Sequence, residues 1–96
     1  MNGVQLIRAE RTRQRSRNGE GKSATWDNQH RRGQLAMAAA VYATPPGLRD
    51  QSIRRLLWPG NDWPFKPSED RVRELAKAGA LIAAEIDRLL READRG

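Results

Sequence analysis

The stretch from residue 67 to residue 95 limits the fold of this chain more than any other part of the sequence. Its apolar residues recur at spacings of three and four, which places them on one face of an α-helix about 40 Å long. Pro67 cannot continue a helix from upstream, and Ser68 is the predicted N-cap because its hydroxyl can accept from the first turn. The predicted apolar face consists of Val72, Leu75, Ala76, Gly79, Ile82, Ala83, Ile86, Leu89, Leu90 and Ala93.

A second helix is predicted over residues 27–43, with Asp27 or Asn28 as its N-cap and a stop at the two prolines that follow Thr44. This helix is rich in alanine, and the long C-terminal helix carries a comparable run of small residues. Because small side chains let two helices approach closely, we expect the two small-residue faces to pack on each other. They comprise Ala36, Ala38, Ala39, Ala40 and Ala43 in one helix and Ala76, Ala78, Gly79, Ala80, Ala83 and Ala84 in the other.

Two shorter helices complete the predicted set. Residues 4–17 predict a first helix that docks through Val4–Ile7 and frays beyond this patch, because the closely spaced arginines that follow repel one another. Residues 48–58 predict a third helix. The apolar side of the third helix would consist of Leu48, Ile53, Leu56 and Leu57.

Residues 58–67 form a connector with three prolines and one glycine, a composition that forbids regular secondary structure. The connector also holds most of the aromatic residues of the chain. We expect them to cover one end of the helical core, and the alternative is a surface on which a base stacks. These residues are Trp58, Trp63 and Phe65.

The segments together predict an all-α fold, a small bundle of three to four helices with a long C-terminal helix and a Trp/Pro-rich connector. One domain is expected for 96 residues, with a basic N-terminal helix or arm and loop over 1–25 and a helical core over 26–96. The chain has no cysteine, which excludes a disulfide framework and a thiolate zinc site and fits a reducing compartment. No apolar run approaches the ~20 residues of a membrane span. We therefore expect a cytoplasmic protein.

The net charge of +6 is concentrated near the N-terminus, where residues 1–32 hold eight basic and three acidic side chains. Most of the basic residues are arginine, which forms two hydrogen bonds to one phosphate or carboxylate and is less strongly hydrated than lysine. This composition predicts an anionic partner, either nucleic acid or an acidic protein surface. The predicted contact residues are Arg11, Arg13, Arg15, Arg17, Arg31 and Arg32.

Other sites are weaker. Asp27 and His30, three residues apart on one helical face, could begin a divalent-metal site, with Glu85 as the candidate third ligand. A capping aspartate beside a locally bonded histidine explains the same pair without a metal, so no cofactor is expected beyond this candidate ion. The run from Gly19 to Ser23 has the residue types of a phosphate-binding loop but not its spacing, and no strand precedes it.

The sequence WDNQHRRGQLA over residues 26–36 and the KAGALIAAEIDRL segment that begins at Lys77 resemble motifs of small phage- and prophage-encoded proteins. Those proteins read HDD-x-H-x-x-GELA-x-AA-x-x-YA, then a Trp/Pro-rich stretch, then KAGALI-x-AEIERL. The resemblance implies a phage or prophage origin and no particular reaction. This chain has Trp26, Asn28 and Gln34 where the family has histidine or acidic residues, which disfavours a hydrolase and favours binding to an anion.

Three functions follow as hypotheses. The first is a non-enzymatic phage accessory protein that binds nucleic acid or a nucleic-acid-handling host machine, with an anti-defence role such as inhibition of a CRISPR effector. The second is a divalent-metal-dependent hydrolase of nucleotides or phosphoesters, or its degenerate descendant. The third is a helix-turn-helix regulator, in which the third helix would present Arg49, Gln51, Ser52, Arg54 and Arg55 to a major groove. A homodimer through the long C-terminal helix is a further expectation.

Overall fold

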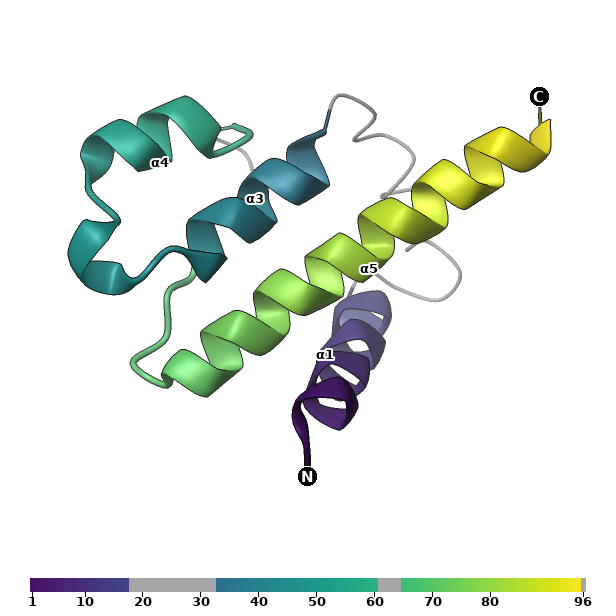
Figure 1. The fold of residues 1–96 in the computed structure, drawn as a ribbon, viewed down its shortest axis with the longest axis horizontal. Helices are drawn as coiled ribbons and strands as arrows, with labels where there is room; N and C mark the ends of the chain where they lie inside the picture. The colour runs from purple at the N-terminus through teal and green to yellow at the C-terminus, as the bar shows by residue number, and fades with distance from the viewer. Residues whose placement is uncertain (18–32, 61–64, 96) are drawn as a thin grey trace.

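The computed structural model describes residues 1–17, 33–60 and 65–95, and this part of the chain is all-α. Figure 1 shows a long helix, α5, that crosses the whole molecule, with α3 and α4 on one side of it and α1 on the other. The predicted small bundle with a long C-terminal helix is confirmed. The elements are α1 (Gly3–Arg17), α3 (Gln34–Ala43), the 3-10 turn η1 (Pro46–Leu48), α4 (Gln51–Leu57) and α5 (Arg71–Arg95).

Helix α5 is capped by Asp70, not by the predicted Ser68. The Asp70 Oδ1 atom accepts hydrogen bonds from the backbone N–H groups of Val72 at 3.1 Å and Arg73 at 3.3 Å. The Ser68 hydroxyl instead accepts from the Asp70 N–H at 3.1 Å and so supports the capping residue. An aspartate also places negative charge at the positive end of the helix dipole, which favours it over serine at this position.

The core lies between α3 and α5, as predicted, although Ala36, Ala40 and Ala43 of the predicted α3 face are exposed. Alanine at most of the contact positions lets the two helices approach closely, and Leu35 and Leu81 fill the space between the backbones. The buried cluster consists of Leu35, Ala38, Ala39 and Tyr42 from α3 and Ala78, Leu81 and Ala84 from α5.

Helix α3 begins at Gln34, whereas the sequence predicted a start near residue 27. Gly33 lies in the left-handed region with φ of 82°, a conformation that side-chain-bearing residues avoid, so the backbone cannot continue helically through it. Residues 27–32 of the predicted helix lie outside the described part of the chain.

Helix α1 crosses α5 where α5 has its one glycine. A Cβ atom added at Gly79 would lie 2.6 Å from Ile7 Cδ1, so any larger residue there would force the Ile7 side chain to move. Asn2 and Gln5 cap the start of α1, each side chain accepting from the backbone N–H of the other at 2.9 Å. The predicted fraying beyond Ile7 is not seen, because the helix runs on to Arg17 and buries Glu10.

The connector covers one end of the α3–α5 core, as predicted for Trp58 and Phe65. The ring centroids of Trp58 and Phe65 lie 5.1 Å apart. The centroid of the Tyr42 ring lies 5.6 Å from that of Trp58 and 5.2 Å from that of Phe65. The Tyr42 hydroxyl accepts from the Lys66 N–H at 3.1 Å, which fixes the end of the connector to α3. Trp63 lies outside the described residues.

The predicted apolar faces of α4 and α5 are largely exposed in the structure. On α4 and its preceding turn, Leu56 is 76% exposed and Leu48 is 67% exposed, because α4 contacts α3 only along the side that carries Ile53 and Leu57. On α5, the large side chains of the predicted apolar face are about half exposed. The exposed residues of that face are Val72, Leu75, Ile82, Ile86, Leu89 and Leu90.

Candidate functional site

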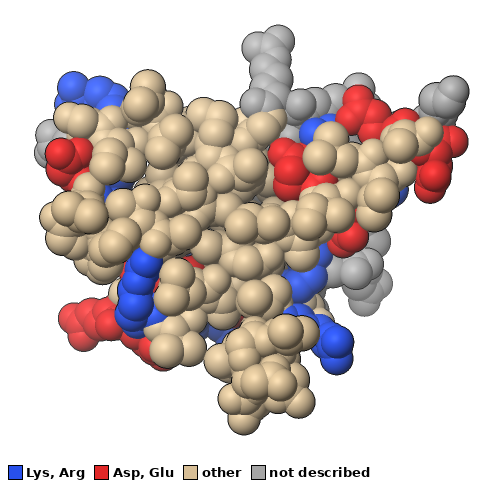
Figure 2. Space-filling view, viewed as in Figure 1, with Lys and Arg blue, Asp and Glu red and all other residues tan. Residues whose placement is uncertain are grey.

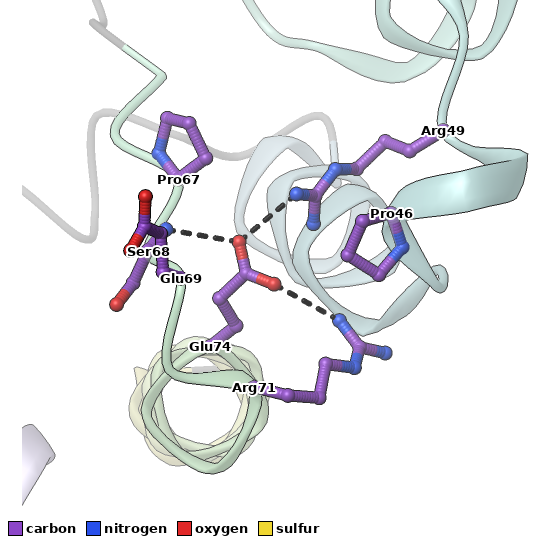
Figure 3. Close-up of a pocket in the computed structure, with 7 residues that line it drawn as sticks. All are labelled: Pro46, Arg49, Pro67, Ser68, Glu69, Arg71 and Glu74. Carbon is purple, nitrogen blue, oxygen red and sulfur yellow. Dashed lines mark hydrogen bonds and ion pairs between the residues drawn. The ribbon is translucent and has the colours of Figure 1, made fainter.

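Glu74 is the centre of the most elaborate polar cluster in the described residues. It projects from the first turns of α5 and its side chain is fully buried. Its Oε2 atom accepts from Arg49 Nη2 at 2.9 Å and from the Ser68 N–H at 3.0 Å, and its Oε1 atom accepts from Arg71 Nη1 at 3.2 Å (Figure 3). One carboxylate therefore joins the segment before α4, the connector and α5.

These donors set the charge state of Glu74. Burial alone would raise its pKa, but the hydrogen bonds from Arg49, Ser68 and Arg71 and the charge of Arg49 outweigh burial, so the pKa lies below its ordinary value of 4.5. The carboxylate is therefore ionised at neutral pH and saturated with donors. A group in this state holds neighbouring segments together and is a poor general acid or base.

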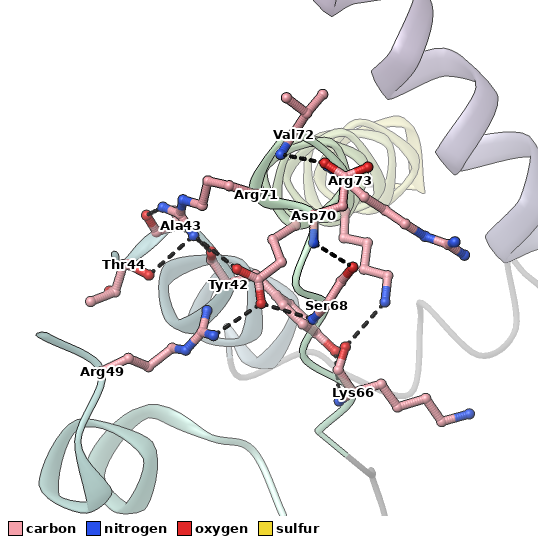
Figure 4. Close-up of polar contacts among 12 residues, drawn as sticks. Tyr42, Ala43, Thr44, Arg49, Lys66, Ser68, Asp70, Arg71, Val72 and Arg73 are labelled. Carbon is pink, nitrogen blue, oxygen red and sulfur yellow. Dashed lines mark hydrogen bonds and ion pairs between the residues drawn. The ribbon is translucent and has the colours of Figure 1, made fainter. Parts of the chain in front are cut away.

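A cleft of about 430 Å³ adjoins this cluster, lined by Pro46, Arg49, Pro67, Ser68, Glu69, Arg71 and Glu74. Its arginines are turned toward protein groups. Arg71 donates to the carbonyl oxygens of Tyr42 at 2.8 Å, Thr44 at 3.2 Å and Ala43, and so completes the C-terminal end of α3 (Figure 4). The Arg49 guanidinium carbon lies 5.1 Å from the centroid of the Phe65 ring. The cleft therefore follows from the way the segments are tied together.

A second buried cluster lies further along α5. Arg88 donates from Nε to Glu85 at 2.6 Å and from Nη1 to Glu92 at 2.8 Å. The hydrogen bond that Arg88 donates to Glu85 is the main reason that the pKa of Arg88 lies above its ordinary value. Glu85, the candidate third metal ligand, is thus bound to a guanidinium. Within the described residues no group of three or more His, Asp or Glu side chains could hold a metal ion.

The predicted anion-binding arginines divide into two sets. Arg11 lies 3.3 Å from Asp87 of α5, and Arg13 lies 3.4 Å from Glu10, so both are used within the chain. For the other predicted residues the side chains lie outside the described part of the structure, which leaves both the arginine surface and the metal pair as predictions. These residues are Arg15, Arg17, Arg31, Arg32, Asp27 and His30.

A different set of cations faces outward, without an ion pair to any described residue. Arg54 and Arg55 extend from α4, and Arg54 lies with its guanidinium carbon 4.6 Å from the centroid of the Phe65 ring. From the sequence, Arg54 and Arg55 were predicted to bind DNA only as part of a helix-turn-helix. No motif in the sequence shows that these two arginines lack an acidic partner among the described residues. The complete set is Arg8, Arg54, Arg55, Lys66 and Arg73.

An apolar surface runs along the outward side of α5. We call Leu75, Ile82, Ile86 and Leu89, together with the flanking Val72 and Leu90, the α5 stripe. In the space-filling view, uncharged residues cover most of the face over which α5 passes, and the charged side chains gather toward its edges (Figure 2). Pairing of α5 with a second copy stays a prediction.

Comparison of the chain with protein-family models, with curated proteins and with solved structures finds no match. None of the helices in the described ranges combines the length and the apolar character needed to cross a bilayer.

Proposed function

We propose that this protein is a non-enzymatic binding protein that docks a positively charged surface on a polyanion, either nucleic acid or the acidic face of a nucleic-acid-handling machine. The observation that carries the proposal is the unequal use of the two charges. Most acidic side chains of the described residues are tied up inside the fold, while five basic side chains point outward without an ion pair to a described residue.

The acidic residues serve the fold in two ways. Asp50 caps α4 by accepting from the Ile53 N–H at 3.0 Å, as Asp70 caps α5. Five further acidic residues bind arginines of the same chain. They are Glu10, Glu74, Glu85, Asp87 and Glu92. Acidic charge is thereby held close to the backbone or to a neighbouring guanidinium, and it screens little of the field that the outward cations produce.

The α4 arginines have the chemistry that this proposal needs. A guanidinium offers five N–H donors in a plane, so Arg54 can stack on Phe65 and still present its outer edge to a phosphate or carboxylate. Arg55 is exposed beside it on the same helix. The resemblance to phage-encoded proteins would place such binding in an anti-defence role, for instance against a CRISPR effector.

The test is fluorescence anisotropy of labelled single-stranded and duplex oligonucleotides across a salt series. Direct binding should weaken by about 0.7–0.9 decade per decade of salt for each phosphate neutralised. Replacing Arg54 and Arg55 of α4 by glutamine should weaken binding at least tenfold at low salt. The matched control replaces the same two by lysine, which keeps the charge but loses the planar guanidinium, so it should bind more tightly than the glutamine variant and less tightly than the parent.

Two results would count against this function. An affinity that does not change with salt would exclude direct nucleic-acid binding, and equal affinity of the glutamine variant and the parent would exclude this surface. The alternatives have less support. Glu85, needed for the metal-dependent hydrolase, is bound to Arg88, and Arg49, needed for the helix-turn-helix reading, is turned inward to Glu74.

A further inference from the structure

The apolar positions of α5 follow a stricter rule than helical amphipathicity requires. Spacings of three and four alternate without a break for three heptads, a period of 3.5 residues that is typical of a helix which winds around a second long helix. The positions are Val72, Leu75, Gly79, Ile82, Ile86, Leu89 and Ala93. An ordinary face packed within a small domain is broader and does not need this regularity.

The rest of the chain leaves most of this row of alternating apolar positions, which we call the seam, exposed. Helix α3 packs on a different side of α5, where Ala78, Leu81 and Ala84 are buried. Helix α1 covers the seam at Gly79, where Ile7 sits. Beyond that crossing, Ile82 is 48% exposed and Ile86 is 52% exposed. A row of half-exposed aliphatic side chains of this length is at the upper end of the apolar patches that monomers expose, about 300–600 Å², and patches of that size are often interaction sites.

Length, charge and area all favour a second copy of this chain as the occupant. The alternating apolar positions run from Val72 to Ala93, through most of the 25 residues of α5, and no other described helix exceeds the 15 residues of α1, so another α5 is the matching element. The stripe contains no charged residue, so two copies meet there without like-charge repulsion although each carries +6. Six half-exposed aliphatic side chains offer roughly 600 Å² per copy, about 1,200 Å² for a pair, which reaches the range of specific interfaces.

We propose that two copies of the protein pair through their α5 stripes in an isologous, two-stranded interface. Most of the large residues at the alternating positions suit two strands, with β-branched Val72 and Ile86 in one set and Leu75 and Leu89 in the other, and Ile82 departs from this pattern. Because the interface is isologous, each copy contributes the same stripe and the contact closes after two subunits. This pairing is independent of the proposed binding to a polyanion, because it uses none of the outward cations. Its tests therefore contain no nucleic acid.

The first test is the mass of the full chain in solution by light scattering, from about 1 to about 100 µM, since dimerisation depends on protomer concentration. We expect about 22 kDa at the upper end, twice the 10.9 kDa of one chain. Replacing both Ile82 and Ile86 by glutamate should give the single-chain mass at every concentration. The control is Leu56→Glu on α4, where the side chain is 76% exposed and lies off the stripe, and this variant should remain dimeric.

A second test uses the absence of cysteine from the chain. Ile82→Cys near the middle of the stripe should cross-link into a covalent dimer with a short bismaleimide, and Ser52→Cys on α4 should not. Circular dichroism of each variant checks that the helices are kept. A single-chain mass at about 100 µM, or a mass unchanged by the two glutamates in a folded variant, would overturn the proposal. Equal cross-linking at positions 82 and 52 would also overturn it.

Discussion

The two sides of α5 have the opposite character to the one that amphipathicity predicts. The side that faces the molecule carries Glu74, Glu85 and Arg88, all buried, while the outward side carries the aliphatic stripe, including Ile82 and Ile86. The difference shows that periodicity identifies which residues share a face without deciding which face is covered by the same chain. The small residues that permit close approach to α3 lie on the same buried side, where Ala78 and Leu81 alternate with these charged residues.

The charged side is tolerable because each buried group meets its partner locally. Glu85 and Arg88 lie one turn apart on the helix, and Glu74 finds donors on the segments that pass its position. A paired and hydrogen-bonded charge costs far less to bury than a lone one. The aliphatic side has no such partner within the described chain, which is the reason to look for one outside it.

The largest expected effect comes from the buried charged side. Glu74→Ala should destabilise the chain by about 3–5 kcal/mol. The Arg49 side chain is only 7% exposed, and the substitution would leave its charge buried without the carboxylate that neutralises it. Chemical denaturation followed by circular dichroism measures this loss. Glu69→Ala, on the exposed segment just before α5, is the control and should cost well under about 1 kcal/mol. Equal losses in the two variants would contradict the role assigned to Glu74.

Two adjacent residues provide the sharpest comparison of the two sides. Leu81 is 5% exposed and Ile82 is 48% exposed. Leu81→Ala should cost about 2–4 kcal/mol through lost burial and a cavity in the α3–α5 core, and Ile82→Ala should cost less than about 1 kcal/mol. Both are measured by urea denaturation in a chain that also carries Ile86→Glu, so that pairing of copies does not contribute. If Ile82→Ala proves as costly as Leu81→Ala, the orientation of α5 is wrong.

Acid should remove part of the folding stability that the ionised Glu74 side chain contributes. Its pKa is lower in the folded chain than the ordinary 4.5, so its ionised form adds stability above pH 4.5. That contribution should decline as the pH falls below 4.5 and disappear once the pH passes the folded-state pKa. Denaturation midpoints between pH 7 and pH 3 measure the decline. Glu74→Gln should show a shallower loss over this interval, and an identical slope in the two proteins would contradict the assignment.

The smallest effect is expected between α1 and α5. The Arg11–Asp87 pair has a half-exposed carboxylate, with 50% of the Asp87 side chain accessible, and such pairs contribute about 0–1 kcal/mol. Asp87→Asn should therefore lower stability by less than about 1 kcal/mol in low salt and by less still in high salt. A large loss would mean that α1 depends on this contact, and not on Ile7 at Gly79, for its position.

Much of the architecture was predictable from the sequence because it depends on local chemistry. Spacings of three and four gave the helices, and the alanine runs gave the α3–α5 contact. The errors lie where tertiary structure chooses between local options. Asp70 and Ser68 are both good caps, and where the chain turns into α5 decides that Asp70 is the one used. Gly33 reads as one more small residue within the predicted helix until its φ of 82° shows that α3 begins only after it.

The candidate site was less predictable, since it depends on which charges the fold uses internally. Arg11 and Arg13 belonged to the predicted anion surface and are bound to Asp87 and Glu10. For Arg11 no spacing rule reveals a partner 76 residues away. The bond between Glu85 and Arg88 was accessible, because glutamate and arginine three residues apart on a helix face one another. A glutamate that is paired in this way is a poor metal ligand, so the same spacing argues against Glu85 as one.

Arg71 belongs to the first turn of α5, yet its side chain supplies the hydrogen bonds that the last carbonyls of α3 lack. Helix α3 has only ten residues, too few to persist in water by itself, and its final turn is completed by a residue from the next long element. The two helices should consequently appear and melt as one cooperative unit. A fragment that ends before residue 71 would contain every residue of α3 and still be unable to keep it helical.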